Sequence, residues 1–85
     1  MDFEEYIKHN FEICDGKFTS YSASGYFTVQ KFGWGGNEYK VIGHGADYDT
    51  GYSIDKDSYG DWYLMRGYTK VCALIHLGGE NWRKS

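Results

Sequence analysis

Two cysteines and three histidines carry the most direct chemistry in this sequence. Cys72 and His76 are four residues apart, so they share a face whether their segment is a strand or a helix, whereas His9 and Cys14 would lie about 140° apart on a helix. Thiolate and imidazole are ligands that zinc takes tetrahedrally. Free cysteine, however, is most often a small buried apolar group. Cys72 and His76 are therefore weak metal candidates, and we expect no bound metal or cofactor.

Nucleophilic catalysis is the second chemistry that the side chains offer. Cys14 or Cys72 could act with His44 and Asp47, which stand in a glycine-rich stretch, while Ser53 lacks the second glycine of a nucleophile elbow. A chain of 85 residues has little volume for both a core and a water-excluding pocket. A small hydrolase that uses His44, or a metal-binding protein that uses Cys72 and His76, is thus an alternative that we do not favour. We expect a protein that is not an enzyme.

Carboxylates and phenols between positions 47 and 61 are the most unusual feature of the chain. Residues 38–61 sum to −4, whereas residues 62–85 sum to +3. Spaced carboxylates steer a molecule toward a basic surface, and tyrosine is enriched among the residues that dominate binding energy. Our candidate partner-binding residues are Asp47, Tyr48, Asp49, Tyr52, Asp55, Asp57, Tyr59 and Asp61, with Trp34 as a further exposed anchor. The simpler interpretation is a solubilising pair of loops with tyrosines packed on a sheet.

The elements that must position these residues fit in one domain, residues 1–85. The chain has a mass of 9.8 kDa and a net charge of −3. Its nine Tyr, five Phe and three Trp together make up 20% of its residues. So short a chain cannot build two cores. The core must therefore consist largely of aromatic rings.

Residues 2–16 have the pattern of an amphipathic helix. Asp2 can cap it, and Glu5 completes a capping box three residues later. Phe3, Ile7 and Phe11 follow at helical spacing. Gly16 would end this helix in the left-handed conformation.

From residue 17 the apolar pattern changes to a period of two, and glycine recurs at short intervals, which is typical of an antiparallel sheet. Strands are predicted at residues 18–22, 26–32, 38–42, 52–56, 62–66 and 69–77. Gly67 and Tyr68 suit a type II′ hairpin turn, although residues 69–77 are also compatible with a helix. We expect residues 79–85 to be an exposed tail, of which Trp82 could fold back onto the domain. The predicted fold class is α+β, with one N-terminal helix packed on an antiparallel sheet of about five to six short strands.

Cysteine content and hydropathy predict a cytoplasmic location. Two cysteines are too few for a disulfide framework, and no stretch resembles a signal peptide. The longest apolar run, residues 71–77, is far shorter than the roughly 20 residues of a membrane span. We therefore expect no membrane association.

A single-stranded nucleic-acid-binding module is an alternative. Tyr26, Phe27 and Phe32 on a strand could stack bases, and the C-terminal segment supplies the cations Arg66, Lys70, Arg83 and Lys84. The net charge is negative, however, where phosphate binding needs a basic stripe. We expect no direct nucleic-acid binding. A homodimer built on an exposed sheet edge is a further alternative.

In its size, acidity, aromatic content and lack of catalytic motifs, the chain resembles the small single-domain inhibitors that phages make against host enzymes, anti-CRISPR proteins among them. This resemblance covers no motif and assigns no residue a role. It implies a non-enzymatic inhibitor that acts in the host cytoplasm. Our leading hypothesis is such a binding protein, which docks its acidic, tyrosine-rich face on a basic, nucleic-acid-binding surface of a partner protein.

Overall fold

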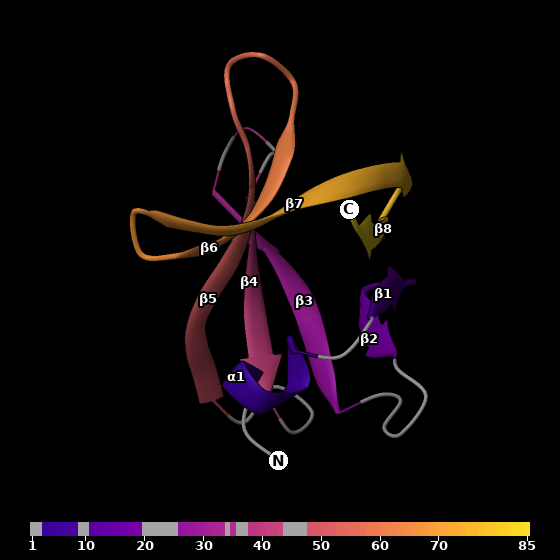
Figure 1. The fold of residues 1–85 in the computed structure, drawn as a ribbon, viewed down its shortest axis with the longest axis vertical. Coiled ribbons are helices and arrows are strands. Elements are labelled where there is room, and N and C mark those ends of the chain that lie inside the picture. The colour runs from indigo at the N-terminus through magenta and orange to yellow at the C-terminus, as the bar shows by residue number, and fades with distance from the viewer. Residues whose placement is uncertain (1–2, 9–10, 20–25, 34, 36–37, 44–47) are drawn as a thin grey trace.

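The computed structural model describes residues 3–8, 11–19, 26–33, 35, 38–43 and 48–85 of the chain. Eight antiparallel strands form a closed barrel in which each strand pairs with its neighbours in the chain, and the last strand pairs with the first (Figure 1). The elements are α1 (Phe3–Tyr6), β1 (Glu12–Cys14), β2 (Lys17–Thr19), β3 (Phe27–Phe32), β4 (Glu38–Gly43), β5 (Tyr48–Lys56), β6 (Trp62–Arg66), β7 (Thr69–Gly78) and β8 (Asn81–Lys84).

The predicted helix over residues 2–16 is wrong beyond its first turn, and so is the α+β class. Helix α1 has only four residues, and β1 and β2 form a hairpin instead. Its two turn residues, Asp15 and Gly16, have φ angles of 54° and 76°. Two successive positive φ angles define a type I′ turn, for which Asp-Gly is a preferred sequence. Gly16 therefore turns a hairpin rather than ending a helix, and the fold is a nearly all-β barrel.

The strand predictions in the middle of the chain are confirmed at β3, β4, β6 and β7. Residues 69–78 form a strand, which rules out the helix considered for this segment. Gly67 has a φ of 61° in a two-residue turn between Arg66 and Thr69, as the predicted type II′ turn requires. Strand β5 is longer than predicted, because it begins at Tyr48 rather than at residue 52. Strand β8 was not predicted and lies in the segment that we expected to be an exposed tail.

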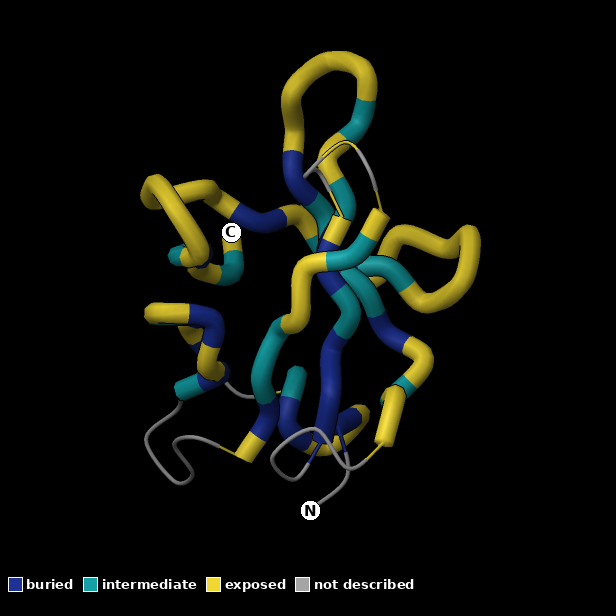
Figure 2. Tube along the Cα trace, turned by 180° about the vertical axis from the view of Figure 1, so that it is seen from behind, coloured by how far each residue is buried: buried dark blue, intermediate teal, exposed yellow. Residues whose placement is uncertain are grey.

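Long-range pairing of β1 with β8 closes the barrel. Ile13 pairs with Trp82, and both side chains are fully buried. Figure 2 shows that buried positions recur along the strands of the barrel. In the closed order every strand described by the structure has a partner on both sides. A free edge strand, on which the alternative of an edge-to-edge homodimer depends, is therefore missing from this part of the chain.

Aromatic rings fill the barrel in two groups. At the α1 end, Phe3 packs edge-on against Phe18 and Phe27 with ring centroids 5.2 and 4.9 Å apart. In the other group, Trp82 packs against Trp62 and Tyr39 at 5.2 and 5.0 Å. Edge-to-face pairs of this kind contribute about 0.5–1.5 kcal/mol each beyond their buried area. The expected aromatic core is therefore present.

In the described part of the chain, no helix has the length and apolar character needed to cross a membrane.

Candidate functional site

Strand alternation along β5 divides the acidic and tyrosine-rich segment between the two sides of the barrel wall. Tyr52 and Ile54 are buried in the core, whereas Ser53 and Asp55 are only partly buried. Successive side chains of a strand point to opposite faces, which accounts for this pattern. Tyr52 is thus mainly a core residue and is not an exposed anchor.

Tyr52 is linked to two charged groups at the α1 end of the barrel. Its ring lies 4.6 Å from that of Phe3, and its hydroxyl donates to Glu4 Oε1 at 3.3 Å. Glu4 also pairs with the guanidinium of Arg66, which lies 5.8 Å from the centre of the Tyr52 ring. Burial, followed by the negative charge of Glu4, raises the pKa of Tyr52 above its ordinary value, and Arg66 opposes this shift.

Two of the predicted carboxylates pair with lysines. Asp49 Oδ2 lies 3.8 Å from Lys40 Nζ, and Asp57 Oδ2 lies 4.0 Å from Lys70 Nζ. The ammonium group of Lys70 also lies 4.0 Å from the centre of the Tyr63 ring. These contacts neutralise part of the charge that the sequence places in this segment, and one of the cations comes from the C-terminal half of the chain.

The β5–β6 turn, residues 57–61, holds the most exposed of the predicted tyrosines. Asp57 Oδ1 accepts the backbone N–H groups of Tyr59 and Asp61 at 3.0 and 2.9 Å. Backbone bonds from Asp57 to Asp61 (2.9 Å) and from Gly60 to Asp57 (3.1 Å) close the turn further. Tyr59 nevertheless remains 90% exposed. A tightly hydrogen-bonded turn therefore presents an uncovered aromatic ring.

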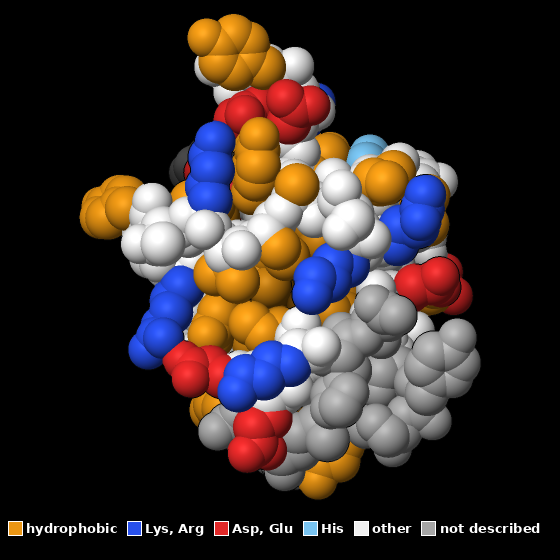
Figure 3. Space-filling model, viewed as in Figure 1, with side chains coloured by type: hydrophobic (Ala, Val, Ile, Leu, Met, Phe, Trp, Pro, Cys, Tyr) orange, Lys and Arg blue, Asp and Glu red, His pale blue; other side chains and the backbone are white. Residues whose placement is uncertain are grey.

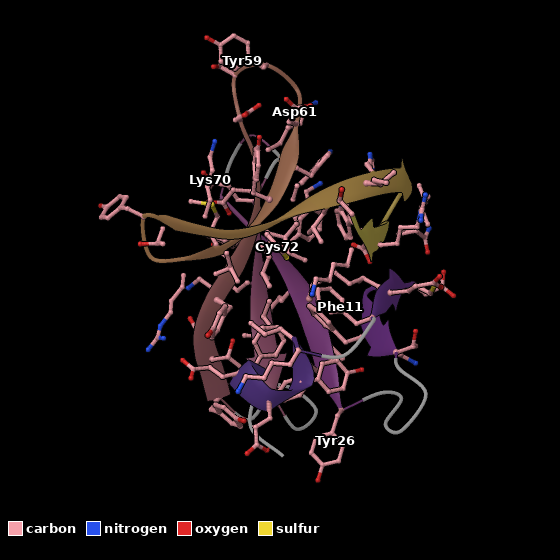
Figure 4. All side chains as sticks on the ribbon, in the orientation of Figure 1. Phe11, Tyr26, Tyr59, Asp61, Lys70 and Cys72 are labelled. Carbon is pink, nitrogen blue, oxygen red and sulfur yellow. The ribbon has the colours of Figure 1, made fainter. Side chains whose placement is uncertain are left out.

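The predicted face does not form one continuous surface. Figure 4 shows Tyr59 at the far end of the β5–β6 hairpin and Asp61 below it, nearer the barrel. Figure 3 shows hydrophobic and acidic side chains together at this tip. Tyr48 and Asp49 are exposed at the opposite end of β5, near α1. Asp47 and Trp34 lie outside the described residues.

Tyr68 is an exposed residue that the sequence reasoning did not select. It lies in the β6–β7 turn, residues 67–68, and its side chain is fully exposed. The predicted Gly67–Tyr68 turn was the available signal, because side chains at the tip of a tight turn point into solvent. Its neighbours Arg66 and Lys70 are basic, so this turn differs in charge from the β5–β6 turn.

The metal and nucleophile candidates do not come together. Cys72 and His76 are separated by four residues of an extended strand, about 13 Å. His76 Nε2 lies 2.8 Å from the carbonyl oxygen of Gly79, and burial raises the pKa of the Cys72 thiol, an effect that Lys84 opposes. His44 lies outside the described residues. Across residues 3–8, 11–19, 26–33, 35, 38–43 and 48–85, no three His, Cys, Asp or Glu side chains are grouped to hold a metal ion.

The residues considered for nucleic-acid binding are largely engaged within the protein. Phe27 is fully buried, and a lysine lies over the ring of Phe32 at 5.0 Å. Arg66 and Lys70 are each paired with a carboxylate, and Lys84 Nζ donates to the carbonyl oxygen of Ile7 at 3.3 Å. Base stacking and phosphate contacts would compete with these interactions.

The fold and these surfaces define a small antiparallel β-barrel with an exposed tyrosine on each of two hairpin turns. No protein-family model matches the chain, and neither a curated protein nor a solved structure matches it significantly.

Proposed function

We propose that the protein is a non-enzymatic binding protein that contacts a partner protein through the β5–β6 turn. The observation that carries this proposal is the combination of a 90% exposed Tyr59 ring with a turn held by four hydrogen bonds. Transfer of a large apolar side chain from water into a pocket stabilises a complex by about 1.5–3 kcal/mol. A preorganised turn loses little further entropy on binding, so most of that gain is retained.

The charge of the turn favours a basic partner surface. Asp61 is exposed beside Tyr59, and Asp57 adds a second carboxylate to the same turn, which Lys70 partly neutralises. Carboxylates around an aromatic anchor disfavour a phosphate backbone and favour lysine and arginine. The partner would thus have a ring-sized pocket bordered by cations, as nucleic-acid-processing proteins have along their binding clefts. Occupation of such a cleft would inhibit the partner.

The two free cysteines support a location in the cytoplasm. Both Cys14 and Cys72 are unpaired thiols in the structure, and free thiols persist in reducing compartments.

Affinity capture with matched variants tests this function. The wild type and the variants Tyr59→Ala and Tyr68→Ala are used as baits in the same lysate, and the captured proteins are quantified. Tyr68 is the matched control, because it is equally uncovered on the neighbouring hairpin. We expect a partner that is captured by the wild type and by Tyr68→Ala but lost with Tyr59→Ala. Equal capture by all three baits would show that the β5–β6 turn is not the contact.

Salt dependence tests the electrostatic part of the proposal. The association rate with that partner should fall as salt rises from about 0.1 to 0.5 M, because the screening length falls from about 10 Å to below 5 Å. An association rate that does not change with salt would refute a basic partner surface.

A further inference from the structure

A shallow, open cavity of about 210 Å³ is lined by residues of α1, β5 and β6. Figure 1 shows α1 near the end of β5 that is opposite to the β5–β6 turn. Its lining contains three aromatic rings, two of them phenols, together with one carboxylate, one guanidinium and one aliphatic hydroxyl; these groups belong to Phe3, Tyr48, Tyr52, Glu4, Arg66 and Thr50. We call this cavity the cation cage. It goes beyond the function proposed above and does not depend on Tyr59.

The rings of the cation cage are held in place by the barrel. Tyr52 and Phe3 are buried and in ring contact at 4.6 Å. Tyr48 is half exposed and lies across Gly43 of β4 so closely that a Cβ atom there would be 2.4 Å from its ring. The hydroxyl of Thr50 donates to the carbonyl oxygen of Val41 at 2.8 Å. The aromatic walls are therefore formed before any ligand enters.

Aromatic faces next to a carboxylate are the groups that bind organic cations in proteins. The protein already places one of its own cations here, because Arg66 pairs with Glu4 and lies over the Tyr52 ring. Arg66 therefore shows which chemistry the cavity accepts.

The internal cation and its carboxylate partner are both open to solvent, so an external cation can reach them. The side chains of Arg66 and Glu4 are 64% and 54% exposed. Exposed ion pairs of this kind contribute little to stability, and their long side chains readily change rotamer. An external cation can thus replace Arg66 on Glu4 and Tyr52 while the guanidinium of Arg66 moves into water.

We propose that the cation cage binds the guanidinium or ammonium group of an arginine or lysine side chain of another protein, in place of Arg66. Arg66 then acts as an internal competitor that lowers the affinity of the site. Removal of Arg66 should strengthen binding, whereas neutralisation of Glu4 should weaken it.

The test is an amide NMR titration of the full chain with Nα-acetylarginine amide at constant ionic strength. We expect the amide signals of Glu4 and Tyr52 to shift, with about two- to fivefold tighter binding to Arg66→Ala. Glu4→Gln should bind about fivefold more weakly or not at all, because the charged acceptor is lost. Glu5→Gln, with the same charge change one position away, is the control and should bind like the wild type. Both Glu4 and Arg66 are exposed, so these variants are expected to fold.

Three results would overturn the proposal. One is binding to Arg66→Ala that is equal to or weaker than binding to the wild type. Another is an equal loss of binding in Glu4→Gln and Glu5→Gln, which would indicate only a general negative field. The third is binding of tetramethylammonium without binding of the arginine amide, because the site would then take a free quaternary cation rather than a protein side chain. Since none of these variants alters Tyr59, their failure is distinct from a failure of the β5–β6 contact.

Discussion

Asp55 on β5 lies directly opposite Glu38 on β4 in the antiparallel register. Like charges in directly opposed positions of a sheet are destabilising. One oxygen of the Asp55 carboxylate, Oδ1, is also buried, and no hydrogen-bond partner reaches it from the described residues. The outer face of the barrel therefore carries a local electrostatic conflict.

Relief of this conflict should stabilise the fold. We expect Asp55→Asn to raise the free energy of unfolding by about 0.5–1 kcal/mol, measured by urea denaturation at pH 7. Asp61→Asn makes the same charge change at an exposed turn position, and its effect should stay within about 0.5 kcal/mol. A loss of stability in Asp55→Asn would mean that its carboxylate has a stabilising partner.

The β1–β2 turn should depend on glycine. Gly16 has a φ of 76°, a region that alanine reaches only at a cost of about 1–2 kcal/mol, whereas asparagine enters it more easily. Gly16 also donates to the carbonyl oxygen of Glu80 at 3.1 Å and accepts from Val29 at 2.7 Å, so it joins three parts of the barrel. Gly16→Ala should therefore lose more stability than Gly16→Asn in thermal unfolding. Equal losses would count against the type I′ turn.

This turn also explains why the predicted helix failed. Phe3, Ile7 and Phe11 have helical spacing, but the same apolar side chains are also compatible with a short helix followed by a strand. Asp15-Gly16 was the deciding local signal, because that dipeptide favours a two-residue hairpin. The pairing of β1 with β8 joins residues about 70 positions apart, and no local pattern shows such a contact. The central strands, in contrast, follow from local alternation and could be predicted.

The sequence predicted the local features of the candidate site but not its tertiary contacts. The exposure of Tyr59 and Asp61 follows from a short turn of polar residues and Gly60, which the sequence shows directly. Tyr52 is buried because it lies two residues before Ile54 in the same strand and therefore points to the same side. The prediction of one exposed acidic and tyrosine-rich face overlooked this alternation. The lysine pairs of Asp49 and Asp57 depend on tertiary contacts. Such contacts cannot be derived from the spacing of charges along the chain.

The pKa of Tyr52 makes stability depend on pH in the alkaline range. Because the folded state raises this pKa above the ordinary value of 10.0, the unfolded chain loses its phenolic proton first as pH rises. The stabilising contribution is complete below pH 10.0 and is lost as pH rises through the higher folded-state pKa.

The free energy of unfolding of the wild type should therefore fall more steeply above pH 10 than that of Tyr52→Phe, which keeps the ring and removes the titrating group. At pH 7 the variant should lose about 0.5–1 kcal/mol for the hydrogen bond to Glu4. Urea denaturation from pH 7 to pH 11 measures both effects. Parallel pH profiles for the two proteins would contradict the raised pKa.

The Cys72 thiol should be a poor nucleophile. Burial raises its pKa and thereby lowers its thiolate fraction, while Lys84 lowers the pKa. In a Cys14→Ala background, iodoacetamide at pH 8 should alkylate Cys72 more slowly in the folded than in the urea-unfolded chain. Lys84→Met should slow the folded-state reaction further. Faster alkylation of the folded chain would indicate an activated thiol and would support Cys72 as a nucleophile.

Site-specific photocrosslinking tests the central claim, that Tyr59 on the β5–β6 turn is the anchor for a partner protein. The photoreactive residue p-benzoylphenylalanine is placed at position 59 or, for comparison, at position 68, and both proteins are irradiated in the same lysate. Both positions are highly exposed, so simple accessibility affects them alike. We predict one dominant crosslinked protein for position 59, diminished by excess unlabelled wild type and not by excess Tyr59→Ala. Crosslinks of equal yield from both positions, insensitive to the wild-type competitor, would contradict the claim.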